Sequence, residues 1–196
     1  MNKIDELIEK LCPNGVKYIE LKEICTFNRG KSITSKIAKN GNIPVISGGQ
    51  KPAFYHNIAN RPENTITIAG SGAYAGYVSF WKEPIFCSDA FSVDIINENI
   101  LNKRYLYHFL LNNQDKIYSK KVGAGIPHVY GKDIANFFIP VPPLEIQREI
   151  VEILDKFTES LSKLQALLKA EIEARQKQYE YYRDKLLTFK ELVIDK

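Results

Sequence analysis

The chain has 196 residues, 44% of them hydrophobic and 11% aromatic, which is enough apolar material for a globular domain with a buried core. No run of eighteen apolar residues occurs, and the first residues lack the basic-then-apolar order of a signal peptide, so we expect a cytoplasmic protein rather than a membrane or secreted one. Cys12, Cys25 and Cys87 show no CxxC spacing and the histidines are scattered, so we expect buried, inert thiols and no metal site.

The net charge of +4 is unevenly distributed along the chain. Residues 1–142 hold 17 Lys and Arg against 12 Asp and Glu, whereas residues 143–196 hold 10 against 11. Two stretches, residues 24–62 and 116–132, contain no acidic residue at all. This distribution favours an anionic partner for the front part of the chain.

In chain order, apolar spacing first predicts an amphipathic helix over residues 2–11, ended by Pro13-Asn14-Gly15. Residues 17–27 suggest a strand followed by a short helix, and residues 41–93 are mainly short β-runs separated by Gly, Pro and Asn. Helical spacing returns over residues 102–121, and residues 133–142 form a last element. Because strands and helices alternate without a βαβ rhythm, we predict an α+β fold with a mixed β-sheet and flanking helices.

Three prolines, Pro140, Pro142 and Pro143, then interrupt the chain and lead into a long helix. Each proline keeps the residue before it out of helical geometry, and Pro143 can occupy the first turn of the new helix. A helix from about residue 144 to residue 189 would be roughly 68 Å long at 1.5 Å per residue. We therefore predict a rigid joint between a globular domain, residues 1–142, and a helical rod, residues 143–190, followed by a short tail, residues 191–196.

Apolar residues of the rod recur at steps of four and three, the pattern of a coiled-coil seam. The seam consists of Ile150, Leu154, Phe157, Leu161, Leu164, Leu168, Ile172, Arg175, Tyr179, Tyr182, Leu186 and Phe189. Two consecutive steps of four, at Leu164, Leu168 and Ile172, form one stutter, which locally unwinds a supercoil without ending it. Such a stripe needs a partner helix, and the alternative is a helix folded back on its own domain.

Three short motifs invite a catalytic interpretation that their context does not support. "GSGAYAG" (Gly70 to Gly76) is followed by a predicted strand, whereas a dinucleotide loop leads into a helix, so a tight turn between strands is favoured. "VPPL" (Val141 to Leu144) lacks the polar and aromatic groups of an adenine methyltransferase motif. Glu20 and Lys22 lack the acidic partner of a nuclease metal site, and we expect them to be surface charges.

The two acid-free stretches instead combine basic groups with hydroxyl, amide and aromatic side chains, which is the chemistry that contacts phosphates and base edges. Ser71 and Tyr74 of the glycine-rich turn join them as candidates. The predicted DNA-binding residues are Arg29, Lys31, Ser32, Lys36, Gln50, Lys51, Tyr55, His56, Ser71, Tyr74, Lys120, Lys121 and His128.

The segments "LIEKLCPNGVKYIELKEICTFNRGKSIT" (Leu7 to Thr34) and "VGAGIPHVYGKDIANFFIPVPPLEIQREIVEILDKF" (Val122 to Phe157) resemble the specificity subunits of type I restriction-modification systems. The resemblance implies target recognition domains that each bind one half of a bipartite DNA site, separated by long helices that pair antiparallel. It also implies modification subunits, which methylate adenine at N6 with AdoMet, and restriction subunits, which use ATP and Mg²⁺. The specificity subunit itself would hold no cofactor and no catalytic residue.

This chain differs from that pattern because it has one recognition domain and one long helix, about half of the usual protein. We therefore expect a homodimer through the seam, reading an inverted repeat of double-stranded DNA. A different class of function remains open at this point: a self-contained DNA methyltransferase or nuclease that uses the domain for recognition.

Overall fold

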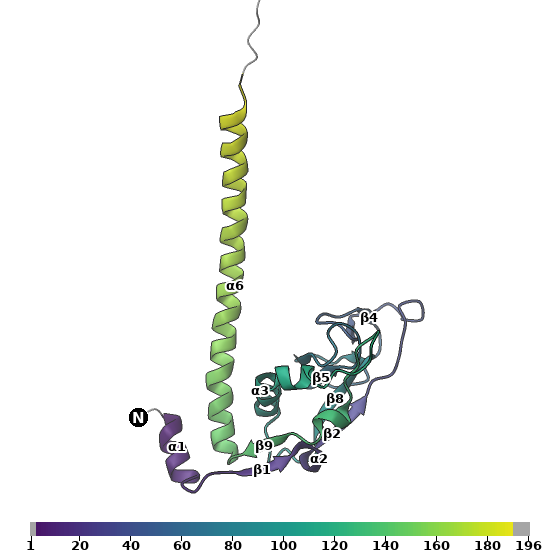
Figure 1. Cartoon of the computed structure of the whole chain (residues 1–196), viewed down its shortest axis with the longest axis vertical. Coiled ribbons are helices and arrows are strands. Elements are labelled where there is room, and N and C mark those ends of the chain that lie inside the picture. Colours follow the sequence, from purple (N-terminus) through teal and green to yellow (C-terminus); the bar gives the residue numbers. More distant parts are fainter. Residues whose placement is uncertain (1–2, 190–196) are drawn as a thin grey trace, which may run out of the picture. The chain divides into compact units, whose positions relative to one another are not determined.

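The computed structural model describes residues 3–189 (Figure 1). These residues fall into two compact units that divide between Val151 and Glu152. Sheets and helices are mixed in the first unit, which confirms the predicted α+β fold. The division lies after the boundary expected at residue 142, because the first turns of the long helix pack against the first unit. Residue 190 and the predicted tail, residues 191–196, lie outside the described residues.

A four-stranded antiparallel sheet, in the order β2-β8-β5-β6, forms the centre of the first unit. Figure 1 labels β2, β8 and β5 of this sheet. Its strands are β2 (Cys25–Arg29), β8 (Ala90–Ile95), β5 (Thr65–Ala69) and β6 (Val78–Trp81). Every residue of β5 is buried. Ile66 and Ile68 point into the main core, while the Trp81 indole N–H donates a 2.8 Å hydrogen bond to the Thr67 hydroxyl and so satisfies a buried polar group.

Two smaller sheets flank the central one. The three-stranded sheet has the order β4-β3-β7, with β3 (Ile43–Ile46), β4 (Phe54–His56) and β7 (Phe86–Cys87). The two-stranded sheet pairs β1 (Lys17–Glu20) with β9 (Phe138–Val141) in antiparallel register (Figure 1). The β1–β9 pair joins the start of the domain to its end, next to the point where the chain leaves for the long helix.

Five short helices complete the first unit. They are α1 (Lys3–Leu11), α2 (Leu21–Ile24), α3 (Lys103–Asn112), α4 (Gln114–Tyr118) and α5 (Gly131–Ile134). The Asn102 side chain caps α3 by accepting hydrogen bonds from the Arg104 and Tyr105 N–H groups. The single helical stretch expected over residues 102–121 is divided at Asn113, whose backbone leaves helical geometry and whose buried amide donates to the Phe109 carbonyl at 2.8 Å. Helix α3 packs against β6 and buries Leu106 and Leu110.

The long helix α6 (Leu144–Leu187) starts immediately after the prolines. Pro143 caps it, because the Pro143 carbonyl accepts from the Gln147 N–H at 3.1 Å, so this proline lies one residue before the first turn rather than within it. Pro142 is buried. The Tyr105 hydroxyl donates a 3.0 Å hydrogen bond to the Pro140 carbonyl, and burial raises the pKa of Tyr105 to about 12.

The seam predicted along α6 is exposed in the single chain from Leu154 onward. Phe157 is 64% exposed, Leu168 58% and Leu186 66%. Among residues 3–189, no helix is long and apolar enough to cross a membrane. Large apolar side chains at coiled-coil spacing are thus exposed to water, which is typical of a helix that pairs with another helix.

Candidate nucleic-acid interface

Several connecting segments leave the central sheet at the same end. Arg29, the last residue of β2, pairs with Phe91 near the start of β8. Ala69, the last residue of β5, pairs with Ala90, the first residue of β8. The segments after β2, after β5 and before β8 therefore emerge together, although they are up to 60 residues apart in sequence.

Two further segments join this end through backbone contacts. The loop before α5 is tied to the turn after β5, since Val129 N–H donates to the Gly70 carbonyl and Gly72 N–H to the Pro127 carbonyl, both at 3.0 Å. The loop after β3 approaches so closely that a Cβ on Gly48 would lie 2.3 Å from the Ser71 carbonyl oxygen. We call the five segments together, residues 29–36, 47–53, 70–77, 87–90 and 120–130, the loop surface.

The loop surface contains most of the residues predicted to contact DNA. These are Arg29, Lys31, Ser32, Lys36, Gln50, Lys51, Ser71, Tyr74, Lys120, Lys121 and His128. They are exposed or half-buried. Tyr55, in β4, lies outside these segments and is 57% exposed. The fold thus gathers at one end of the sheet residues that the sequence placed in two separate stretches and one turn.

The structure argues against the prediction that His56 contacts DNA, because this residue is only 8% exposed. Its Nδ1 accepts a 3.1 Å hydrogen bond from the Lys39 N–H, and its ring meets Phe86 edge-on with centroids 5.4 Å apart. The ring therefore holds the segment before β3 against the small sheet, and it is no longer a candidate for reading bases. Sequence spacing could not show this, because the two partners lie 17 and 30 residues away.

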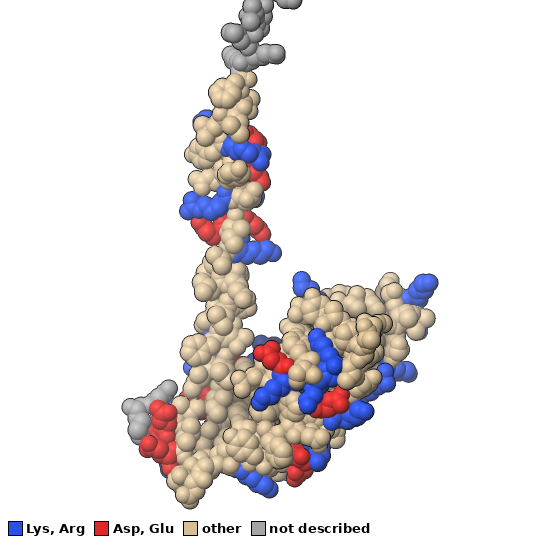
Figure 2. Space-filling view, in the orientation of Figure 1, with Lys and Arg blue, Asp and Glu red and all other residues tan. Residues whose placement is uncertain are grey.

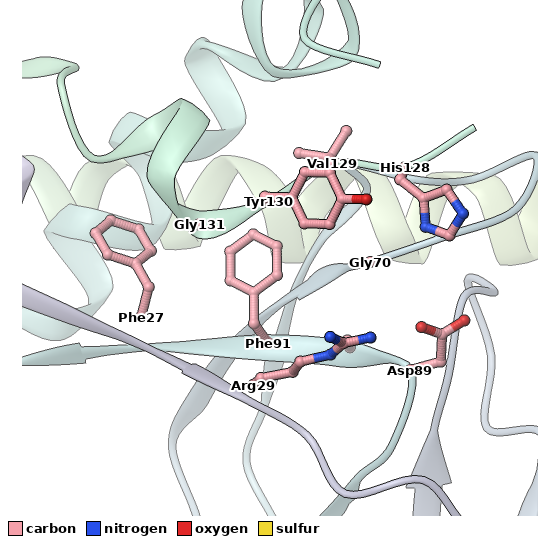
Figure 3. Close-up of a pocket in the computed structure, with 10 residues that line it drawn as sticks. Phe27, Arg29, Gly70, Asp89, Phe91, His128, Val129, Tyr130 and Gly131 are labelled. Carbon is pink, nitrogen blue, oxygen red and sulfur yellow. The ribbon is translucent and has the colours of Figure 1, made fainter. Parts of the chain in front are cut away.

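A pocket of about 90 Å³ opens on the loop surface (Figure 3). Phe27 and Phe91 form its apolar end, and their rings lie 6.3 Å apart. Arg29, Asp89 and His128 line the opposite, polar end, where the Arg29 guanidinium extends along the pocket toward Asp89 (Figure 3). The pocket thus presents a hydrogen-bond donor group and an acceptor group beside a hydrophobic wall.

The sequence does not single out Asp89, because this residue lies outside the two stretches that are free of acidic residues. The Ser71 hydroxyl donates a hydrogen bond to Asp89 Oδ2, so the carboxylate is oriented by the turn after β5. An oriented carboxylate accepts hydrogen bonds from an amino group such as cytosine N4, just as a guanidinium donates to guanine O6 and N7. Asp89 is therefore a candidate for base reading in spite of its charge.

Tyr130 was also missed, although it follows His128 at the two-residue spacing of a strand. The two rings are nearly parallel, with an interplanar angle of 8° and centroids 6.0 Å apart. The Lys132 ammonium group lies 5.5 Å from the Tyr130 ring centroid. The pair forms a flat aromatic face at the mouth of the pocket, of the kind that contacts sugars and bases.

The two lysines of the last loop differ in their surroundings. Lys121 Nζ donates a 3.1 Å hydrogen bond to the Ala73 carbonyl and lies 4.4 Å from the Tyr118 ring centroid, so this side chain also ties the loop to the turn after β5. Lys120 is exposed. Lys120 is therefore the better candidate for a contact made only with phosphate.

The charged side chains of the first unit are spread over its surface. Figure 2 shows blue Lys and Arg side chains around this face of the globular unit, with fewer red carboxylates between them. Within residues 3–189, no cluster of three His, Cys, Asp or Glu side chains could hold a metal ion. The arrangement offers cations for phosphates and mixed polar groups for bases.

The motifs that resembled catalytic ones have structural roles in this fold. The glycine-rich segment is a turn between the antiparallel strands β5 and β6, as predicted, and Gly72 and Gly76 take positive φ values of 84° and 86° that favour glycine. Lys22 forms an ion pair with Glu20, in agreement with a surface role. Neither segment presents the geometry of a cofactor loop or of a metal-dependent nuclease.

A comparison with known protein families identifies the family of this chain. Residues 13–174 match the type I restriction modification DNA specificity domain. The chain belongs to this family. The match covers the loop surface, the proline junction and more than half of α6, which confirms the resemblance seen in the sequence.

Individual type I specificity subunits are also similar in sequence to this chain. A type I restriction enzyme specificity subunit of Escherichia coli is 38% identical over 133 residues, covering 65% of this chain and 33% of the relative. The MpnII specificity subunit of Mycoplasma pneumoniae is 29% identical over 183 residues, covering 87% of this chain and 52% of the relative. The chain thus spans between a third and about half of the length of these specificity subunits.

Solved structures share the fold. The S subunit of a type I restriction-modification system from M. genitalium matches with a TM-score of 0.69 at 20% identity, covering 84% of this chain and 45% of that one. A subunit from Thermoanaerobacter tengcongensis matches with a TM-score of 0.57 at 22% identity, covering 82% and 44%. The loop surface therefore lies on a fold that this chain shares with type I specificity subunits.

Proposed function

We propose that this chain is the DNA-reading component of a type I restriction-modification complex, with each copy binding one half of a bipartite double-stranded site. The observation that carries the proposal is the loop surface: basic, amide, hydroxyl and aromatic side chains from five segments meet at one end of a rigid sheet, in a chain of the specificity family. Binding residues on loops held by a rigid scaffold are the usual arrangement for recognition.

The proposal assigns two roles to the loop surface. Lys31, Lys51 and Lys120 neutralise phosphates, which gives affinity without sequence preference. Arg29 and Asp89 contact base edges at the pocket, which gives sequence preference. The apolar wall of Phe27 and Phe91 adds a surface for the thymine methyl group or an open base face.

The chain would direct catalysis rather than perform it. We propose that modification subunits dock with it in the cytoplasm and supply the AdoMet-dependent methylation of adenine, and that a restriction subunit, using ATP and Mg²⁺, joins through the same complex. The alternative, a self-contained methyltransferase or nuclease, predicts methyl transfer or cleavage by the purified chain. We expect neither until a modification subunit is added.

We further propose that two copies associate through α6. The exposed seam supports this, because a stripe of large apolar side chains over more than thirty residues is stabilised by a second helix. A two-fold pair would read an inverted repeat, since the symmetry of the protein is mirrored in the site. Sedimentation at micromolar concentration should show a dimer, alone or with the modification subunit, and a monomer in both samples would contradict this part of the proposal.

DNA binding provides the direct test of the recognition role. We expect the purified chain with its modification subunit to bind a duplex that contains its methylation site far more tightly than a duplex with a scrambled site. We also expect affinity to fall steeply as salt rises. Equal affinity for the two duplexes at every salt concentration would contradict sequence reading by this chain.

A further inference from the structure

Arg61 belongs to the first of the two stretches without acidic residues, yet its guanidinium group faces the protein. Its Nη2 donates to the backbone carbonyls of Asn28 and Arg29, at 3.0 and 3.1 Å. Its Nη1 donates to the Asn60 carbonyl at 2.8 Å, and its Nε donates to the Ser92 hydroxyl at 2.7 Å. Each nitrogen of the guanidinium is thus bound within the fold, so Arg61 differs from the exposed cations that can neutralise phosphate.

An acidic side chain balances the charge of Arg61. The Ser92 hydroxyl, which accepts from Arg61, donates to Asp94 Oδ2 at 2.7 Å. The side-chain amide of Asn28 donates to the same carboxylate oxygen at 2.9 Å. Ser92 is fully buried, and hydrogen bonds to charged groups are stronger in such surroundings than in water. The network therefore holds the end of β2 in one geometry.

Asn60 holds a second part of the loop surface, the segment before β8. Its Oδ1 accepts from the Cys87 N–H at 2.6 Å, and its Nδ2 donates to the Cys87 carbonyl at 2.9 Å. One side-chain amide thus binds both backbone groups of a single residue, which fixes its orientation as well as its position. Cys87 lies two residues before Asp89, the acceptor group of the pocket. Asn60 therefore does for the segment of Asp89 what Arg61 does for the end of β2.

The two segments also contact each other directly. The Gly30 N–H donates to the Ala90 carbonyl at 2.8 Å, and the Lys31 N–H donates to the Cys87 carbonyl at 3.0 Å. The backbone of Gly30 lies so close to the Ser88 carbonyl that a Cβ would not fit between them. A displacement of either segment is therefore passed to the other, and to the pocket that both segments line.

We infer that Asn60 and Arg61 are positioning residues for base reading: they set the distance between the donor and the acceptor of the pocket and do not contact DNA themselves. The donor is the Arg29 guanidinium and the acceptor is the Asp89 carboxylate (Figure 3). The inference rests on the proposed function, because it takes the loop surface as the part of the chain that reads DNA. Supporting residues must hold such groups to within about 0.5 Å of their productive geometry.

A positioning role and a purely structural role have different consequences for binding. Loss of a purely structural contact would lower stability and weaken binding to every duplex alike. Loss of a positioning contact would act on the base pairs that Arg29 and Asp89 contact, and would leave the phosphate contacts in place. The salt dependence of binding measures the phosphate contacts, whereas the relative affinity for duplexes that differ by one base pair measures the base contacts.

Arg61→Lys and Asn60→Asp are the test variants, measured in the complex of the full chain with its modification subunit. Lysine keeps the charge of Arg61 but lacks the planar fork that binds several acceptors at once. Aspartate keeps the shape of Asn60 but cannot donate to the Cys87 carbonyl. Competition binding should show discrimination reduced by about tenfold at the base pairs where Arg29→Ala and Asp89→Asn act, with an unchanged salt slope.

Two controls separate positioning from stability. Gln147→Glu removes the hydrogen bonds that a buried amide at the start of α6 donates to the Ile100 and Pro142 carbonyls. It should lower the midpoint of urea denaturation yet keep the wild-type base preference. In a chain that already carries Arg29→Ala, Arg61→Lys should have no further effect on discrimination at the base pair that Arg29 contacts, because the group that Arg61 positions is absent.

The outcomes distinguish this inference from the proposed function. If the wild-type complex does not prefer its site over a scrambled duplex, the proposed function fails and the positioning role fails with it. If the wild-type complex does prefer its site, but Arg61→Lys and Asn60→Asp keep every base preference or weaken all duplexes equally, only the positioning role is overturned. Should circular dichroism show that Arg61→Lys does not fold, Asn60→Asp alone decides between these results.

Discussion

Gln147 Nε2 donates a 2.7 Å hydrogen bond to the carbonyl oxygen of Pro142, five residues earlier, across the junction of the globular unit and α6. The same amide nitrogen donates to the Ile100 carbonyl at 2.9 Å, and Oε1 accepts from the Asn102 N–H at 2.8 Å. The side chain is completely buried. One glutamine therefore ties the proline segment, the first turn of α6 and the start of α3 to each other, which explains in physical terms how the long helix begins.

Removing this amide should destabilise the junction. Gln147→Ala leaves buried donors and acceptors without partners, and we expect the free energy of unfolding of the globular unit to fall by about 2–4 kcal/mol. Gln147→Glu keeps the acceptor for Asn102 but loses both donor bonds, so it should also destabilise. Urea denaturation followed by circular dichroism measures the effect. The exposed Gln165→Ala is the matched control and should change stability by less than about 0.5 kcal/mol.

Phosphate contacts can be separated from base contacts by salt dependence. Lys120→Ala together with Lys121→Ala should weaken binding to every duplex and lower the slope of log K against log salt by up to about two. Lys121→Ala should in addition loosen its own loop, because it removes the hydrogen bond to Ala73. Lys163→Ala, on the helix, is the control, and a slope unchanged in the double variant would place the DNA elsewhere.

Arg29 and Asp89 should control sequence preference. We expect Arg29→Ala to cost about 1–3 kcal/mol on the recognised duplex and to relax the preference at one or two base pairs. Asp89→Asn replaces an acceptor by a group that can also donate, so it should alter the preferred base rather than lower affinity uniformly. Competition binding with a library of duplexes measures both effects. Identical base preferences in wild type and both variants would exclude the pocket from base reading.

Thiol reactivity should follow burial. Burial raises the pKa of the Cys25 thiol to about 12 and that of Cys87 to about 11, so both are protonated and unreactive at pH 8. Cys12 is only half-buried, so the expectation of three buried, inert thiols is wrong for this residue. Iodoacetamide at pH 8 should therefore modify one thiol rapidly, that of Cys12. Mass spectrometry counts the modified residues, and all three should react in denaturant. Rapid labelling of Cys25 or Cys87 in the folded chain would contradict the packing described above.

The sequence predicted local features well and long-range contacts poorly. Apolar spacing gave the helices, the strand-rich middle and the long helix after the prolines, because these depend on neighbours within a few residues. His56 is buried against a residue 17 positions away, and Asp89 is oriented by Ser71, 18 positions away. Gln147 binds residues 45 and 47 positions away. Side chains at such distances meet only once the sheet order is known.

The most direct test of DNA reading is to map adenine-N6 methylation in a host that carries this chain and its modification subunit. We predict methylation at a bipartite inverted repeat, absent when the chain is omitted and altered in its base preference by Asp89→Asn. Modification that is unchanged by omission of the chain, or a motif unaffected by substitutions at Arg29, Asp89 and Lys120, would contradict the assignment of sequence recognition to the loop surface.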